Sequence, residues 1–144
     1  MAITFKDTII KPVQELDSDF YDRIKSAPVL SQETGKRKKT KRKYLDVVSS
    51  FDIETTRLHD FTHDEIKKAR KNHEVLNDLT AMYIWQWAFS FKDPDGIHTV
   101  CTYGRKWSEF LDFARKITNL TGDNVYIVVY DHNLSYEFQF LKGI

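Results

Sequence analysis

The sequence predicts an α/β domain with a mixed sheet and flanking helices, and three observations predict it. A β-prone run that carries two carboxylates near its end spans residues 44–56 (YLDVVSSFDIETT). An aromatic hairpin pattern follows at residues 82–103, interrupted by the turn sequence DPDG. A helical period at residues 107–122 then leads into the apolar run 125–130. A hairpin joined through a helix to a parallel strand is an α/β arrangement.

Composition excludes several classes of protein. The 144 residues are 41% hydrophobic and 14% aromatic, with five glycines and three prolines, which is typical of a globular chain. The single cysteine, Cys101, excludes an internal disulfide framework and is typical of a reducing cytoplasm. No apolar run approaches the roughly 20 residues of a membrane span, and no signal peptide is visible. We therefore expect a cytoplasmic protein with no membrane partner.

The net charge of +1 hides an uneven distribution. From Leu45 onward there are 15 acidic and 11 basic residues, a net charge of −4. Just before this part, seven of eight consecutive positions are cationic: Lys36, Arg37, Lys38, Lys39, Lys41, Arg42 and Lys43. Such a run is either a solvated segment, a nuclear-localisation signal, or a contact for nucleic-acid phosphates without sequence preference. We therefore divide the chain into an N-terminal extension with a basic segment (1–43) and a domain (44–144).

The N-terminal extension has weak signals. Residues 3–13 predict a short strand, and Asp17 or Ser18 is placed to cap a short helix that runs through Ile24. The segment after Pro28 reads as a loop.

The run 44–56 predicts a strand with two different faces. Asp52 and Glu54 leave the same face, about 6.5–7 Å apart along the strand. Phe51 and Ile53 point the opposite way, into a core. Two carboxylates at this spacing can share a divalent cation, because hard cations prefer oxygen ligands. Taken alone, the pair also fits an ordinary strand that runs out into a polar turn.

A polar insertion at residues 57–78 follows this strand, with a helix expected around residues 64–76. It contains His59, His63 and His73. His59 and Asp64 have the H-x4-D spacing of a possible catalytic base, but three histidines in a charged segment are more typical of a surface.

The second half of the chain alternates between the two-residue period of strands and the 3.6-residue period of helices. Residues 82–91 (MYIWQWAFSF) and 97–103 predict two antiparallel strands. Trp107, Phe110, Leu111, Ala114 and Ile117 then follow a helical period that ends near Gly122. The run 125–130 (VYIVVY) predicts a central strand that is covered on both faces.

A final helix is expected after Asn133, a favourable N-cap residue. Tyr136, Glu137, Phe140 and Leu141 share one face of it. Glu137 therefore lies on the inward side, where an unpaired carboxylate is costly unless a metal ion or a cationic partner compensates it. A position at the margin of the buried face is the alternative.

FDIETT followed by HNLSYEFQFL resembles the first two motifs of proofreading 3′–5′ exonuclease domains. More narrowly, residues 44–144 resemble the N-terminal exonuclease region of phage-type, protein-primed family B DNA polymerases. The resemblance implies a ribonuclease H-like fold and hydrolysis of single-stranded DNA from its 3′ end with Mg²⁺ or Mn²⁺. It also implies a phage or prophage protein in the cytoplasm of a bacterial host.

The resemblance assigns roles to individual residues. Asp52 and Glu54 match the metal-binding catalytic carboxylates of the first motif. Glu137 matches the catalytic carboxylate of the second motif, where the family more often has Asp. Thr55, Asn133 and Tyr136 match residues that hold the 3′ end, and the basic run would add a track for the DNA backbone.

The sequence departs from the family after the second motif. The family completes its active site with a third motif, Y-x3-D, and none of the seven tyrosines here has Asp four positions on. The predicted fold is therefore a ribonuclease H-like fold truncated after the second motif. Two alternatives to an active nuclease stay open. One is a catalytically incomplete remnant that binds nucleic acid or protein, and the other is one half of a split polymerase completed by a second polypeptide.

Overall fold

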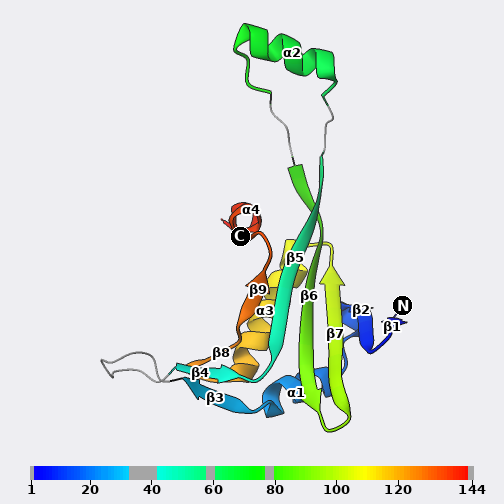
Figure 1. Ribbon diagram of the computed structural model, residues 1–144, viewed down its shortest axis with the longest axis vertical. Helices are drawn as coiled ribbons and strands as arrows, with labels where there is room; N and C mark the ends of the chain where they lie inside the picture. Colours follow the sequence, from blue (N-terminus) through cyan, green and yellow to red (C-terminus); the bar gives the residue numbers. More distant parts are fainter. Residues whose placement is uncertain (1, 33–41, 58–60, 77–79, 143–144) are drawn as a thin grey trace.

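The computed structural model describes residues 2–32, 42–57, 61–76 and 80–142 (Figure 1). In this part of the chain, six strands form a mixed sheet in the order β1-β2-β7-β6-β5-β9, and three form a small sheet in the order β3-β4-β8. The strands are β1 (Ile3–Phe5), β2 (Thr8–Pro12), β3 (Val29–Gln32), β4 (Arg42–Leu45), β5 (Val48–Arg57), β6 (Thr80–Asp93), β7 (Gly96–Gly104), β8 (Val125–Tyr126) and β9 (Val129–Asp131). The helices are the 3₁₀ turn η1 (Val13–Glu15) and the α-helices α1 (Ser18–Ser26), α2 (His63–Asn72), α3 (Trp107–Thr121) and α4 (Leu134–Leu141).

The antiparallel strands β5, β6 and β7 form the centre of the large sheet. Their aromatic and β-branched residues alternate between the two faces, so one face of β6 buries Trp85, Trp87, Phe89 and Phe91. The hairpin predicted from residues 82–103 is therefore confirmed, with strands a few residues longer than expected.

Helix α3 covers the aromatic face of this sheet. Phe113 and Ile117 are its buried contacts, as its 3.6-residue period predicts. The Trp85 indole stacks on Phe113 with ring centroids 6.0 Å apart, and its N–H donates to the carbonyl of Lys106 at 3.0 Å. A Cβ at Gly104 would lie 2.6 Å from the Trp85 ring, so the end of β7 must be glycine for the indole to fit.

The first 43 residues share this core. Strands β1 and β2 extend the large sheet, with β2 parallel to β7. The backbone N–H of Phe20 donates to the Asp17 side chain at 3.1 Å, so Asp17 caps α1 as predicted. Phe20 and Ile24 on α1 pack in the same cluster as Phe89 and Phe113. In the described chain, the basic segment thus connects two parts of one packed unit.

The prediction of a covered central strand at residues 125–130 is wrong. This run forms two short strands: β8 pairs with β4 in the small sheet, and β9 pairs with β5 in the large one. Strand β9 is an edge strand among the described residues, so Val129 and Tyr130 remain exposed. The apolar run changes sheets between Tyr126 and Val129, and the periodicity of a sequence cannot show such a change.

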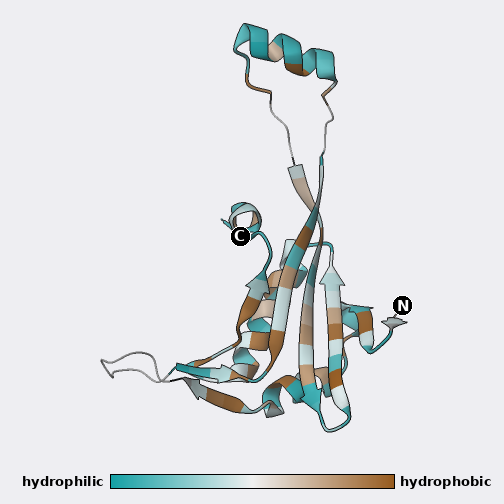
Figure 2. Cartoon of the chain, viewed as in Figure 1, coloured by the Kyte–Doolittle hydropathy of each residue, from teal (hydrophilic) through white to brown (hydrophobic). Residues whose placement is uncertain are grey.

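Helix α2 lies beyond the far end of the β5–β6 hairpin, away from the two sheets (Figure 1). It begins with a capping box between Thr62 and Glu65 and ends at His73, which adopts the left-handed conformation. Its surface is mostly hydrophilic (Figure 2). None of the helices in the described part of the chain has the length and apolar character that a membrane crossing requires.

The described fold is thus mixed α/β with helices flanking a mixed sheet. Strand β6 lies between β7 and β5 and is antiparallel to both, and β9 joins β5 in parallel after the chain has passed through α3. This order places the end of β9, at Asp131, beside Phe51 in β5.

Candidate active site

Strand β5 presents the first two predicted carboxylates on one face. Phe51 and Ile53 are each 6% exposed and lie in the core, while Asp52 is half-buried and Glu54 is exposed. The β5–β6 register shifts between Glu54 and Thr55, because Tyr83 has no partner in β5. Such a bulge increases local twist and redirects side chains, and bulges are frequent beside active sites. The predicted orientation of this strand is confirmed.

Helix α4 brings the third predicted carboxylate to the same place. Glu137 is only 2% exposed, and its Oε2 atom has no hydrogen-bond partner in the structure. Burial first, and then hydrogen bonds and charge from the neighbouring carboxylates of Asp131 and Asp52, together raise the pKa of Glu137 to about 8. Glu137 therefore faces Asp52, so the structure brings two of the three predicted carboxylates together.

Asp131 is a member of this cluster that sequence reasoning missed. It ends β9, and its Cα partner in the parallel pairing with β5 is Phe51, the neighbour of Asp52. Its Oδ1 atom accepts the backbone N–H of Asn133 at 2.8 Å. No local pattern in the sequence indicates this position, because it depends on the pairing of β9 with β5.

Asp52 is held by two hydrogen bonds. Its Oδ2 atom accepts from the Gln86 side chain at 3.2 Å, and its Oδ1 atom accepts from the Ile53 backbone at 3.0 Å. Gln86 is the cross-strand partner of Asp52 on β6. This amide orients the carboxylate without neutralising it, and it was also missed from the sequence.

A hydrogen bond joins the two sequence motifs directly. The Thr55 hydroxyl and the Tyr136 hydroxyl lie 2.9 Å apart, although both residues were singled out for separate contacts with DNA. The Tyr136 ring packs edge-on against Phe140 at 5.3 Å. These contacts fix α4 against the end of β5, so the carboxylates on the two elements keep a defined relation.

Asn133 occupies the predicted N-cap position, but its side chain does not cap the helix. Its carbonyl oxygen accepts the backbone N–H groups of Tyr136 and Glu137, at 2.9 and 3.1 Å. Its side-chain Oδ1 accepts only from the Ser135 hydroxyl, at 3.4 Å. The side chain is exposed beside the cluster and is free to contact a ligand.

The carboxylates open onto the surface. A cleft beside them is lined by Ser50, Phe51, Asp52, Tyr130, Asp131 and His132. A neighbouring hollow is largely apolar and is also lined by Asp131, together with Trp87, Phe110, Leu134 and Leu141. Half-buried Asp52 and Asp131 thus line a cleft that adjoins an apolar hollow.

The predicted basic run is only partly within the described residues. Lys36, Arg37, Lys38, Lys39 and Lys41 lie outside them. Arg42 and Lys43 belong to β4 and are exposed. Of the histidines in the polar insertion, His59 lies outside the described residues, and His63 and His73 are exposed at the two ends of α2.

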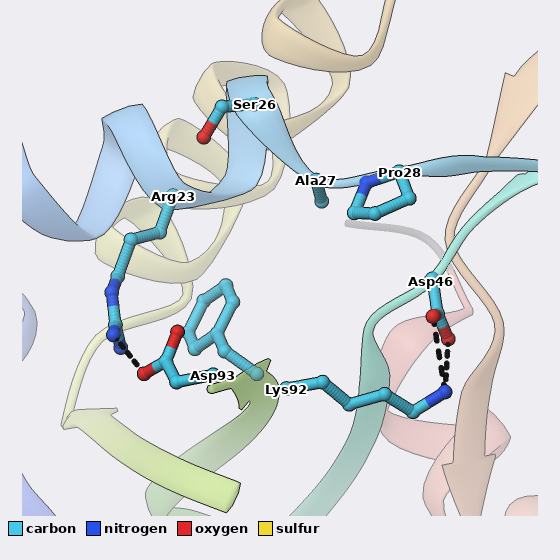
Figure 3. Close-up of a pocket in the computed structure, with 8 residues that line it drawn as sticks. Arg23, Ser26, Ala27, Pro28, Asp46, Lys92 and Asp93 are labelled. Atoms are coloured by element: carbon cyan, nitrogen blue, oxygen red, sulfur yellow. Dashed lines mark hydrogen bonds and ion pairs between the residues drawn. The ribbon is translucent and has the colours of Figure 1, made fainter. Parts of the chain in front are cut away.

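A separate group of side chains can also hold a metal ion. Asp93, Asp95 and His98 have ligand atoms within 4.8 Å of one another, at the hairpin between β6 and β7. Asp93 lies seven residues along β6 from Gln86, the cross-strand partner of Asp52. The Asp93 group is therefore about 23 Å from the Asp52 cluster. The guanidinium of Arg23 pairs with Asp93, and a pocket beside it also holds the Lys92–Asp46 ion pair at 2.8 Å (Figure 3). Because Arg23 already neutralises Asp93, a cation has less to gain there.

The carboxylates around Glu137 suit a divalent ion better by their chemistry. All are hard oxygen donors, and the buried Oε2 atom lacks any partner in the structure. Among the described residues, they do not form a group as tight as the one at Asp93. Comparison of the chain with protein-family models, curated proteins and solved structures finds no match to any of them.

Proposed function

We propose that this chain is the N-terminal exonuclease portion of a phage-type DNA polymerase. Its activity would be metal-dependent 3′–5′ proofreading hydrolysis of single-stranded DNA ends, with Mg²⁺ or Mn²⁺. The observation that carries the proposal is the contact between Asp52 of the first motif and buried Glu137 of the second. Asp52 and Glu137 come from motifs that are far apart in the sequence, the resemblance assigns both of them to the metal centre, and their side chains lie next to each other.

The sheet order supports this proposal. In the ribonuclease H-like fold that the motifs imply, a hairpin feeds a helix and then a strand parallel to the first. Strands β5, β6 and β7, helix α3 and strand β9 follow that order. The carboxylates then lie at the carboxyl end of β9, and the carboxyl ends of parallel strands are a common place for a binding site in α/β sheets.

The residues present divide the chemistry among them. A pair of divalent ions would generate hydroxide from water and stabilise the leaving 3′ oxygen. Asp52, Glu54 and Glu137 would hold these ions, with Asp52 fixed in orientation by Gln86. Because Glu137 retains its proton up to a pH of about 8, it must release that proton when it becomes a ligand.

Other residues are placed to hold the DNA. Thr55, Asn133 and Tyr136 lie at the junction of β5 and α4, where a 3′ terminus would enter. Exposed Tyr130 on the adjacent cleft offers a surface for base stacking. Helix α2 adds four exposed cations for phosphates: Lys67, Lys68, Arg70 and Lys71.

One observation favours a second candidate, a half of a split polymerase completed by another polypeptide. Apolar side chains are exposed on β9, on the residue before it and on α4: Val128, Val129, Tyr130, Leu134 and Phe138. Exposed apolar surface next to a functional site is typical of an interface. A second polypeptide would cover this apolar surface.

A 5′-labelled single-stranded oligonucleotide tests the activity. Incubated with the chain and Mn²⁺ or Mg²⁺, it should shorten stepwise from its 3′ end, and a variant with Asp52→Ala and Glu54→Ala should leave it intact. If the wild type shortens nothing but still binds the oligonucleotide, the nuclease proposal fails and the non-catalytic alternative stands. If activity appears only after the rest of a polymerase is added, the split-polymerase candidate is favoured.

A further inference from the structure

We propose that Asp131 is a further ligand in the metal centre of Asp52, Glu54 and Glu137. This inference rests on the proposed function and goes beyond it, because neither sequence motif assigns a role to Asp131.

The sheet places Asp131 next to the first-motif carboxylate. Strand β9 runs parallel to β5, and the register pairs Asp131 with Phe51. Asp52 is the next residue along β5, and the same cleft is lined by both Asp52 and Asp131. Asp131 is therefore held by backbone pairing in a sheet, which positions a ligand more precisely than a loop does.

The Asp131 carboxylate is oriented but not neutralised. One of its oxygens accepts the Asn133 backbone N–H at 2.8 Å, which fixes the side chain at the start of α4. A carboxylate has about four acceptor sites, so this bond leaves most of its capacity for a cation. No Lys, Arg or His in the described chain forms an ion pair with Asp52, Asp131 or Glu137.

The buried carboxylate opposite Asp131 independently points to a cation. Glu137 is 98% buried, and its Oε2 atom has no hydrogen-bond partner in the structure. Buried polar atoms are nearly always satisfied, so an orphaned oxygen that faces two more carboxylates indicates a bound ion. The ligands of the metal centre would thus come from three different elements: Glu137 from α4, Asp131 from β9 and Asp52 from β5.

A purely structural role for Asp131 is the competing explanation. As an acceptor for Asn133, Asp131 helps to form the turn into α4. The substitution Asp131→Asn separates the two roles, because the amide oxygen can still accept that N–H while the negative charge is lost. Asp131→Ser is a second variant of the same kind, since a hydroxyl also forms such turns.

Calorimetric titration of Mn²⁺ into the metal-free chain tests the inference without any nuclease assay. We expect Asp131→Asn and Asp131→Ser to weaken Mn²⁺ binding at least about 10-fold, the order of loss seen when a metal site loses a supporting group. Asp52→Asn should weaken it as well. Asp123→Asn, which removes an exposed negative charge from the turn after α3, should leave it unchanged. Circular dichroism of each variant shows whether the fold is retained.

Two results would overturn the inference in distinguishable ways. If folded Asp131→Asn and Asp131→Ser bind Mn²⁺ like the wild type while Asp52→Asn does not, Asp131 is only a turn residue and the proposed nuclease stands. If the wild type itself binds no Mn²⁺ at millimolar concentration, the metal centre and the proposed function fail together.

Discussion

Glu137 couples proton binding to folding, because its carboxyl is buried beside Asp131 and Asp52. Its pKa is raised from 4.5 to about 8 in the folded chain. Between these values the folded state holds a proton that the unfolded state has released. The stability that depends on this group is therefore complete below pH 4.5 and is lost as pH rises towards 8, at up to roughly 1.4 kcal/mol per pH unit.

The substitution Glu137→Gln should remove this dependence, because the amide resembles the protonated acid. Urea unfolding in EDTA at pH 5, 6, 7 and 8 measures the pH dependence of the free energy of unfolding. The contributions of the other titrating groups cancel when the variant is compared with the wild type. We expect Glu137→Gln to gain stability over the wild type steadily as pH rises. At pH 8, Mn²⁺ should restore the stability of the wild type and should raise the stability of the variant by a smaller amount. Parallel stability curves in EDTA would show that Glu137 titrates normally.

The Thr55–Tyr136 hydrogen bond should couple β5 to α4 energetically. The variants Thr55→Val, Tyr136→Phe and the double variant form a cycle whose coupling energy we expect to be about 0.5–1 kcal/mol, because the bond is partly exposed. Tyr130→Phe is the matched control. Tyr130 lies in β9 and pairs with Ser50 of β5, which is five residues before Thr55 in the same strand. A cycle of Thr55→Val with Tyr130→Phe should give a coupling near zero. Equal values in both cycles would mean that the bond does not hold α4 in solution.

At the scale of whole elements, helix α2 should contribute to DNA binding only through the positive charge of its side chains. Lys67, Lys68, Arg70 and Lys71 fall within an arc of about 160° when residues advance by 100° each, opposite the apolar pair Ile66 and Ala69. None of the four cations forms an ion pair with another described residue. They are thus available to phosphates that approach beyond the end of β5.

Replacing Lys67 and Lys71 with Gln should weaken binding of single-stranded DNA and make it less dependent on salt. Each lost phosphate contact lowers the slope of log K against log salt by about 0.7. Affinity measured by fluorescence anisotropy from 50 to 300 mM NaCl gives this slope. The paired variant Lys25→Gln with Arg115→Gln removes the same charge from α1 and α3. If both pairs change the slope equally, α2 contributes only to the overall charge.

The elements divide clearly into those that the sequence predicts and those that it does not. Periods of two and 3.6 residues predict β6, β7 and α3, because each buries one continuous face. The run 125–130 fails, because an apolar run has no period that distinguishes one buried strand from two short edge strands. The bulge at Tyr83 likewise cannot be predicted from the sequence, since it depends on how β5 and β6 pair.

At the scale of the molecule, the candidate site follows the same division. Asp52, Glu54 and Glu137 were found because local motifs contain them. Asp131 and Gln86 were missed, because their relation to Asp52 exists only through strand pairing. Residues that act through neighbouring strands are therefore found only once the strand order is known.

The N-terminal residues should be essential to the whole fold, although their sequence signals are weak. Phe20 packs edge-on against Phe89 at 5.4 Å and Phe91 at 6.0 Å, and it also contacts Phe113 on α3. Phe20→Ala should therefore lower the free energy of unfolding by about 3–5 kcal/mol. Phe138→Ala is the matched control, because that ring is exposed on α4 and its loss should change stability by no more than about 0.5 kcal/mol.

Tryptophan fluorescence during urea unfolding distinguishes the two variants, because Trp85 and Trp87 lie in the cluster that contains Phe20. A shared core means that Phe20→Ala shifts one cooperative transition for the whole chain, including the β5 strand that carries Asp52. If Phe20→Ala leaves that transition in place, the first 43 residues are an appendage and the carboxylate cluster does not depend on them. A loss for Phe138→Ala as large as that for Phe20→Ala would instead mean that α4 is buried in solution by another chain or another copy.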